Sequence, residues 1–309
     1  MKKYYPSFYD KFSCLCDACP DTCCAKWEIV VDEEALIKYN GINGEFGEKL
    51  RQSLFRDEDG DYLFKLDNGR CPFLNKHNLC DIHINLGKEY TCDVCRQHPD
   101  FVEEYDDFTE ICPSLSCPET VRLIFDASCD EQPYPEISTD SDDYVLQLLA
   151  KGRNRAFEIL RNQMSYKQKL EKLCCLATEI QKEIASFQYE CNADFSFLQS
   201  VEFCRNELEI LTDEWKTILV CTVHKKDIRV EENKLNVLLS YYIYRYFLKA
   251  VNDCDIVTTL RFILFSVWLC EQLYLCSDYS FEEITRLYSK EIEHNTDNIE
   301  KIYTFLRSV

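Results

Sequence analysis

Eleven of the twenty cysteines lie in the first 117 residues, and five of them fall between residues 14 and 24. The segment CLCDACPDTCC also contains Asp17, Pro20 and Asp21, residue types that are typical of a turn. Cysteines in such a setting serve as disulfide halves, metal ligands, redox catalysts or small buried side chains. The chemistry of these thiols decides most of what can be inferred about function.

A disulfide-stapled fold does not suit this chain. Such folds are mostly short, secreted and rich in loops. This chain has 309 residues and only 7 glycines, and its first residues, MKKYYPSFYDKF, lack the apolar segment of a signal peptide. We therefore expect most of the cysteines to be thiols in a reducing cytoplasm.

Metal binding explains the cysteine spacing better. Thiolates are soft ligands that hold zinc or iron–sulfur clusters. The CxxC pairs at residues 16–19 and 92–95 are compatible with a zinc site that closes a long loop. Adjacent Cys23 and Cys24 do not easily reach one tetrahedral ion, whereas a cluster accepts scattered thiols more readily. The pattern predicts a metal centre in residues 1–117, with iron–sulfur favoured over zinc.

The other nine cysteines are spread over the remaining 192 residues. Many sit on apolar helical stretches, where a thiol acts as a small hydrophobic side chain. We expect six of them to be core residues: Cys174, Cys175, Cys204, Cys221, Cys270 and Cys276.

The formal charge of −20 argues against nucleic-acid binding, which requires a basic face. It also disfavours anionic membrane surfaces, and it would attract basic partners such as a lysine-bearing protein segment, although acidity can also simply keep a protein soluble. The most apolar stretch, Phe262 to Cys270, is shorter than the roughly 20 residues that span a bilayer. We interpret it as part of a buried helix.

Several segments carry a resemblance to a known family. They are FSCLCDACPDTCCAKWEIVVD, CPFLNKHNLCDIHINLGKEYTCDVCRQHP, SLSCPETVRLIF, YYIYRYFLKAVNDCD and SKEIEHNTDNI. Together they resemble the bacterial flagellin lysine-N-methylase family. The chain departs from the family pattern at Lys26, where Gly often stands, and at Asp100, where Arg often stands; Cys16, Cys92 and Cys112 are additional to the pattern.

The resemblance implies methyl transfer from S-adenosylmethionine to lysine side chains of a protein such as flagellin, with one or two 4Fe–4S clusters. There is no G-x-G-x-x-G turn, so the cofactor site must differ from a Rossmann site. We take Tyr242, Arg245 and Trp27 as candidates for cofactor binding. The cysteines that match the family pattern are Cys14, Cys19, Cys23, Cys24, Cys71, Cys80, Cys95 and Cys117.

Catalytic candidates come from the EIEH element. Glu291, Glu293 and His294 lie within one helical turn, and a three-residue spacing puts Glu291 and His294 on one face. They would orient or deprotonate a lysine amine; the alternative is a solvated face near a helix end. Tyr241 to Tyr246 would line an amine pocket, or more simply form part of the core.

Two further functions stay open. One is a zinc- or iron-binding protein that handles metal or interacts with a partner. The other is a radical enzyme that uses S-adenosylmethionine through a non-standard cysteine motif and acts on a peptide or small molecule.

The elements that position these residues suggest a mainly α protein. We expect an irregular cysteine-rich module with short strands over residues 1–125, an acidic, proline-containing linker over 126–143, and an all-α bundle over 144–309. Strands are predicted near residues 27–31 and 62–66. The acidic run 100–110 would meet a lysine-rich substrate or, more simply, form a solvated loop, which is the interpretation we favour.

Overall fold

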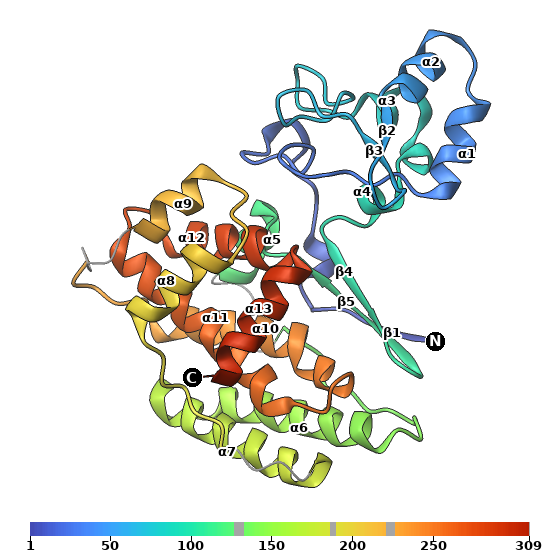
Figure 1. Ribbon diagram of the computed structural model, residues 1–309. Helices are drawn as coiled ribbons and strands as arrows, with labels where there is room; N and C mark the ends of the chain where they lie inside the picture. Colours follow the sequence, from blue (N-terminus) through green and yellow to red (C-terminus); the bar gives the residue numbers. More distant parts are fainter. Residues whose placement is uncertain (127–132, 186–189, 221–225, 309) are drawn as a thin grey trace. The chain divides into compact units, whose positions relative to one another are not determined.

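The chain forms two compact units in a computed structural model, which describes residues 1–126, 133–185, 190–220 and 226–308 (Figure 1). The cysteine-rich unit comprises residues 13–101 and 117–119. The helical unit comprises residues 1–12, 102–116 and 120–309. This division differs from the expected boundaries because the first strand and most of a hairpin from the N-terminal part belong with the helices.

The cysteine-rich unit has only short elements. They are η2 (Cys16–Ala18), α1 (Glu33–Gly41), α2 (Gly44–Gln52), β2 (Leu54–Arg56), β3 (Tyr62–Phe64), α3 (Asp81–Leu86), η3 (Lys88–Tyr90) and α4 (Asp93–Gln97). Strands β2 and β3 are antiparallel, and the strand expected near residues 27–31 is reduced to an isolated bridge onto β3. The Val31 N–H donates to the Tyr62 carbonyl at 2.7 Å, so this segment still borders the sheet.

Local signals in the sequence set the ends of the short helices. The Asp32 carboxylate caps α1 by accepting the Ala35 N–H at 2.9 Å. Helix α3 ends at Gly87, whose φ of 105° lies in a region that glycine adopts without strain. Both helix ends therefore follow from residue types that are typical of helix termini.

A small apolar core holds this unit together and takes in several thiols. Tyr39, Phe64 and Phe73 are its largest side chains, and each is at most 2% exposed. Cys71 and Cys92 are buried in the same cluster, with Cys24 and Cys80 packed against it. A core this small gives limited stability by itself. A metal bound by these thiols would stabilise the unit further.

The helical unit includes a three-stranded sheet in the order β1 (Lys2–Tyr4), β5 (Phe108–Pro113), β4 (Asp100–Glu104). Strand β1 runs parallel to β5, and η1 (Tyr9–Lys11) follows it. The interpretation of residues 100–110 as a solvated loop is wrong, because they form β4 and the start of β5. Every residue of β5 is buried, including Glu110.

Helices make up the rest of this unit, as expected, and the mainly α fold class is confirmed. Helix α6 starts after Asp143, which accepts the Val145 and Leu146 N–H groups at 2.8 and 3.2 Å. The helices are α5 (Pro118–Phe125), α6 (Tyr144–Arg161), α7 (Tyr166–Ile184), α8 (Phe197–Glu207), α9 (Asp213–Val220), α10 (Glu232–Tyr246), η4 (Phe247–Val251), α11 (Ile256–Cys276), α12 (Phe281–Tyr288), the π-helical turn η5 (Ser289–Glu293) and α13 (Thr296–Ser308).

Helix α11 is the central helix of the unit and packs against α7, α10, α12 and α13 (Figure 1). With 21 residues it is longer than the apolar stretch suggested, and among the described residues it is the one helix that could cross a membrane by length and composition. However, 89% of its apolar window is buried inside the protein. Its apolar character is therefore accounted for by the core.

Part of the segment that was expected to be a linker packs into the core. Residues 127–132 lie outside the described part, while Tyr134 and Ile137 are buried in the core.

Four of the six expected core cysteines are buried: Cys174, Cys204, Cys270 and Cys276. Cys175 is exposed on α7, so its prediction is wrong, and Cys221 lies outside the described residues.

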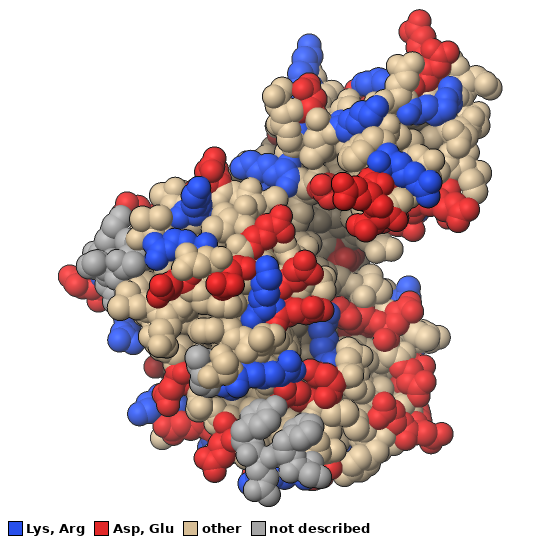
Figure 2. All heavy atoms as spheres, viewed as in Figure 1, with Lys and Arg blue, Asp and Glu red and all other residues tan. Residues whose placement is uncertain are grey.

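Acidic and basic side chains are interspersed on the face shown in Figure 2. The described Lys and Arg side chains form no continuous patch on that face.

Candidate functional site

Backbone pairing brings cysteines from separate loops together in the cysteine-rich unit. The Cys71 N–H donates to the Cys24 carbonyl at 2.9 Å, and Leu74 forms a bridge with Cys80. The Asp81 N–H donates to the Phe73 carbonyl at 2.8 Å and fixes the start of α3 directly after Cys80. Three loops are therefore held with their thiols on one core.

Asp32 ties the fourth loop to this framework. Its second carboxylate oxygen accepts the Asp93 N–H at 2.7 Å, at the first residue of α4. The residue before α4 is Cys92, and its Sγ lies 3.3 Å from Cys95 Sγ. These N–H donors hold the pKa of Asp32 below its ordinary value, against the effect of burial. Asp32 thus joins α1 to the CxxC turn.

We call Cys24, Cys71, Cys80, Cys92 and Cys95 the inner thiol group. Burial, together with the charges of Cys24, Cys80 and Cys92, raises the pKa of Cys71 to about 12. The charges of Cys92, Cys24 and Cys71 likewise contribute to a raised pKa of Cys95. Together with the backbone contacts above, these influences indicate that the five thiols are neighbours, and a cation between them would relieve the repulsion of their thiolates.

A second set, the outer thiol group, consists of Cys14, Cys16, Cys19, Cys23 and Cys117. The charges of Cys14 and Cys117 contribute to a raised pKa of Cys23. Those of Cys14 and Cys19 contribute in the same way to a raised pKa of Cys16. Cys23 also donates its thiol hydrogen to Cys24, which lowers the pKa of Cys24 to about 7. The two groups therefore meet at the adjacent pair Cys23 and Cys24.

The grouping differs from the family pattern at two cysteines, Cys92 and Cys16, since Cys16 lies in the outer thiol group. Cys92 was set aside as additional to the family pattern, yet its thiol lies within the inner group. The CxxC spacing with Cys95 was the signal for it. Cys112, the third cysteine additional to the pattern, lies in the core of the helical unit, in agreement with its exclusion.

The helical unit contains a second polar site around Glu293. This side chain is 4% exposed and accepts hydrogen bonds from the hydroxyls of Tyr246 at 3.2 Å and Tyr241 at 3.4 Å. Burial raises the pKa of Glu293, although the Arg245 charge and the hydroxyl donors, including Ser289, oppose this. Burial also raises the pKa of both tyrosines well above its usual range, so that they act as donors.

His294 contacts the segment that follows β5, although the two lie far apart in the sequence. Its Nε2 lies 2.8 Å from Ser114 Oγ and 3.0 Å from Ser116 Oγ. Ser114 Oγ is also 3.3 Å from Ser289 Oγ. The SLSCP and EIEH elements, which are far apart in sequence, therefore meet in one polar cluster. Ser114 was not predicted, and its place beside the SCP element was the only signal.

Glu291 does not share a face with His294, so this expectation is wrong. Its carboxylate accepts the Leu211 N–H at 2.7 Å and the Thr212 hydroxyl at 2.5 Å. The reason is the π-helical turn η5, whose wider winding changes the angle between residues three apart. Nor is the EIEH element a solvated face, because Glu291 is 2% exposed.

The candidate cofactor residues fall in different units. Tyr242 is fully buried, and its hydroxyl has no hydrogen-bond partner among the described residues. Arg245 pairs with Glu103 at 2.5 Å, and Lys249 pairs with the same oxygen at 2.6 Å. Trp27 is half-buried in the cysteine-rich unit. The tyrosines of α10 form part of the core, in agreement with the simpler interpretation.

Comparison with known proteins supports a metal-binding role for the first part. Residues 15–113 match the family model CxxCxxCC, described as "Putative zinc- or iron-chelating domain". The cysteine-rich part is similar to a metal-chelating domain. This match covers about a third of the chain and includes the whole inner thiol group.

Curated relatives add a second line of similarity. The chain is 29% identical over 128 residues to "Lysine-N-methylase" of Salmonella typhimurium, covering 39% of this chain and 32% of that protein. A lysine-N-methylase of Salmonella choleraesuis shows the same values. "Flagellar biosynthetic protein FliU" of Salmonella muenchen is 29% identical over 134 residues, covering 76% of its length. The matches span about a third of the lysine-N-methylases, and no solved structure matches.

The donor set fits a thiophilic metal. No set of three or more His, Cys, Asp or Glu side chains among the described residues could hold a metal ion as the rotamers stand. The thiols are nevertheless grouped, and backbone N–H groups of Phe73 and Cys95 donate toward Cys71 and Cys92. Such N–H donors stabilise thiolates in metal sites. Zinc and iron both suit these ligands.

Proposed function

We propose that the protein is an S-adenosylmethionine-dependent methyltransferase that acts on lysine side chains of a protein substrate. The similarity to lysine-N-methylases carries this proposal. The buried carboxylate of Glu293, with its two phenol donors, adds a group that can receive a lysine amine. S-adenosylmethionine supplies a methyl group on a sulfonium when it is bound.

Residues of the helical unit would prepare the amine. A lysine is protonated at neutral pH and must lose a proton before its nitrogen can act as a nucleophile. Because burial raises the pKa of Glu293, its carboxylate is a stronger base than an exposed glutamate. Tyr241 and Tyr246 hold this carboxylate in one orientation. His294 and the serines around it would position the turn that carries Glu293.

The cysteine-rich unit would hold an iron–sulfur centre. Four members of the inner thiol group, Cys24, Cys71, Cys80 and Cys95, match the family pattern, and Cys92 is a further candidate. Cys14, Cys19, Cys23 and Cys117 of the outer group are the candidates for a second centre. Methyl transfer to an amine needs no redox step, so the centre would stabilise this unit or help to bind the cofactor.

The charge of the protein is compatible with a lysine-bearing partner such as a flagellin, met in the cytoplasm. A net charge of −20 attracts basic surfaces over long range and repels nucleic acids. The name of the FliU relative links that protein to flagellar biosynthesis, which supports flagellin as the first substrate to test.

A second candidate is a metal-binding protein without methyltransferase activity. The match of residues 15–113 to a chelating domain favours it, because that match requires no catalysis. The lysine-N-methylase similarity also favours it, because the match covers only about a third of that relative's length. In this case the helical unit would bind a partner.

Two measurements decide between these functions. Anaerobically purified protein should contain iron and acid-labile sulfide, whereas one zinc per chain without sulfide would exclude a cluster. The same preparation, incubated with S-adenosylmethionine and flagellin, should yield methylated lysine and S-adenosylhomocysteine in equal amounts. 5′-Deoxyadenosine would instead indicate radical chemistry, and no turnover would favour the metal-binding protein.

A further inference from the structure

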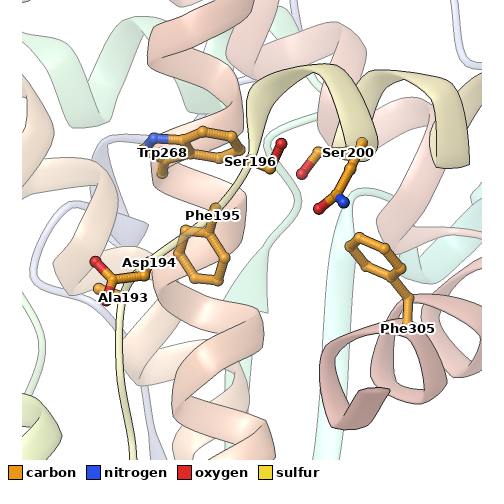
Figure 3. A pocket seen from close by; sticks show the side chains of 8 residues that line it. Ala193, Asp194, Phe195, Ser196, Ser200, Trp268 and Phe305 are labelled. Carbon is orange, nitrogen blue, oxygen red and sulfur yellow. The ribbon is translucent and has the colours of Figure 1, made fainter. Parts of the chain in front are cut away.

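A cavity of about 540 Å³ opens in the helical unit between the start of α8, α11 and α13. Its size is typical of small-molecule sites. Figure 3 shows Phe195 and Trp268 on one side of it and Phe305 on the other, with Ser196 and Ser200 between them. None of the residues proposed for the reaction lines this cavity.

Aromatic rings form its apolar walls. The Phe195 and Trp268 ring centroids lie 5.3 Å apart, and both rings also contact Phe265. On the other side Phe305 stacks on Phe203 with centroids 4.3 Å apart. These second rings fix the orientation of the wall rings. The cavity therefore has aromatic walls on two sides, which suits an aromatic ligand.

The polar groups of the cavity come from one segment. The Asp194 carboxylate is exposed at the rim, and Ser196 and Gln199 are exposed at the start of α8. Ser196 is the N-cap residue of α8, but its side chain makes no capping hydrogen bond. Its hydroxyl therefore remains available to a ligand.

The segment that carries these groups is anchored to its surroundings. The Cys191 N–H donates to the Thr178 hydroxyl of α7 at 3.2 Å, and the Asp194 N–H donates to the Asn192 side chain at 3.3 Å. Ser200 is 1% exposed and donates its backbone N–H to the Ser196 carbonyl at 2.9 Å. The polar groups are thus held in place before a ligand arrives.

The charge of the lining restricts the ligand. None of the described residues that line the cavity is Lys or Arg, and Asp194 is acidic. A di- or triphosphate would lack a counter-charge and would meet a carboxylate. A carboxylate can accept hydrogen bonds from vicinal ribose hydroxyls, and a glutamine amide can pair with the N6 and N7 edge of adenine.

We infer that this cavity binds the adenosine part of an unphosphorylated adenosyl compound. The adenine lies between two walls, one formed by Trp268 and Phe195 and the other by Phe305. The ribose reaches Asp194, and the remainder of the ligand extends past Ser196. If the proposed function holds, the ligand is S-adenosylmethionine, whose sulfonium end must then extend beyond the cavity to meet the lysine amine; only this last step rests on that function. In that case the cofactor pocket differs from the predicted one, because Tyr242, Arg245 and Trp27 do not line the cavity.

Calorimetric titration of the full chain tests this inference, with adenosine, S-adenosylhomocysteine, ATP and tetramethylammonium as separate ligands. We expect adenosine and S-adenosylhomocysteine to bind and ATP to bind at least tenfold more weakly. Trp268→Leu should weaken adenosine about tenfold or more, since base stacking on aromatic rings contributes this much. Asp194→Asn at the exposed rim should weaken it several-fold, whereas Glu202→Gln, an exposed carboxylate of α8 outside the cavity, should leave it unchanged.

Other results would overturn the inference. They are the absence of adenosine binding, equal binding of ATP, binding of tetramethylammonium in place of adenosine, or affinities that neither cavity variant changes. The proposed function is separable from this outcome. Adenosine binding without methyl transfer supports the cavity and contradicts the methyltransferase, while methyl transfer with a KM for S-adenosylmethionine unaffected by Asp194→Asn contradicts the cavity alone.

Discussion

The His294 Nε2 atom lies 2.8 Å from Ser114 Oγ, although 180 residues separate the two in sequence. The same nitrogen is 3.0 Å from Ser116 Oγ. One imidazole thus joins the end of the sheet to the turn that carries Glu293. Because Ser114 is fully buried, this contact replaces hydrogen bonds that water would otherwise make.

Loss of this contact should destabilise the protein. We expect His294→Ala to lower the free energy of unfolding by about 1–3 kcal/mol, since it leaves buried hydroxyls with fewer partners. In a double-mutant cycle with Ser114→Ala, the two effects should differ from additivity by about 0.5 kcal/mol or more. Urea unfolding measures both. Additive effects would show that the two side chains do not interact, and exposed His83→Ala serves as the control.

Glu293 and Glu291 should respond differently to the same substitution. Glu293→Gln removes the proposed base at nearly constant volume and should lower kcat for lysine methylation about 100-fold or more. Glu291→Gln should instead mainly lower stability, because Glu291 accepts the Leu211 N–H and the Thr212 hydroxyl. Initial rates at equal amounts of folded protein distinguish the two. Equal losses of kcat in both variants would contradict the role given to Glu293.

The raised pKa of Glu293 also predicts a dependence of stability on pH. A carboxyl whose pKa is higher in the folded state than its ordinary value of 4.5 favours folding in its protonated form. Its contribution is therefore complete below pH 4.5 and is lost as the pH rises through the folded-state pKa. The free energy of unfolding of the wild type relative to Glu293→Gln should fall over this range. Parallel urea titrations would contradict the prediction if the difference rose with pH.

Much of the fold follows from local signals that the sequence displays. Leu170, Leu173, Ala177 and Ile180 recur at helical spacing, and they lie on α7. Asp32 and Asp143 are recognisable caps because a carboxylate before an apolar run satisfies free N–H groups. These features depend on residues close together in the chain.

The unpredicted features depend on distant residues. Strand β1 pairs with β5 more than 100 positions away. The acidic run 100–110 contains β4 and the start of β5, whose Glu110 pairs with buried Arg153. The π-helical turn at Ser289–Glu293 carries no signature that would separate it from an α-helix. The same holds for the aromatic cavity, since its three rings come from three segments that do not follow one another.

The inner thiol group predicts which cysteines matter for metal content. Cys71→Ser should lower bound metal by at least half, because Cys71 is buried among Cys24, Cys80 and Cys92. It should also lower the melting temperature of the cysteine-rich unit, since bound metal stabilises the fold that binds it. Cys175→Ser, at an exposed thiol on α7, should change neither quantity. Metal analysis of the two variants provides the test, and unchanged metal content in Cys71→Ser would exclude this residue as a ligand.

The ion pair between Arg153 and Glu110 should stabilise the helical unit strongly. Both side chains are buried, and the Arg153 Nη1 donates to Glu110 at 2.7 Å. Replacing Arg153 alone by Met should lower the free energy of unfolding by about 3–5 kcal/mol, because the carboxylate remains buried without its partner. Adding Glu110→Gln should recover part of this loss. Urea unfolding of the two variants tests it, and a double variant less stable than Arg153→Met would show that the unpaired charge is not the cause.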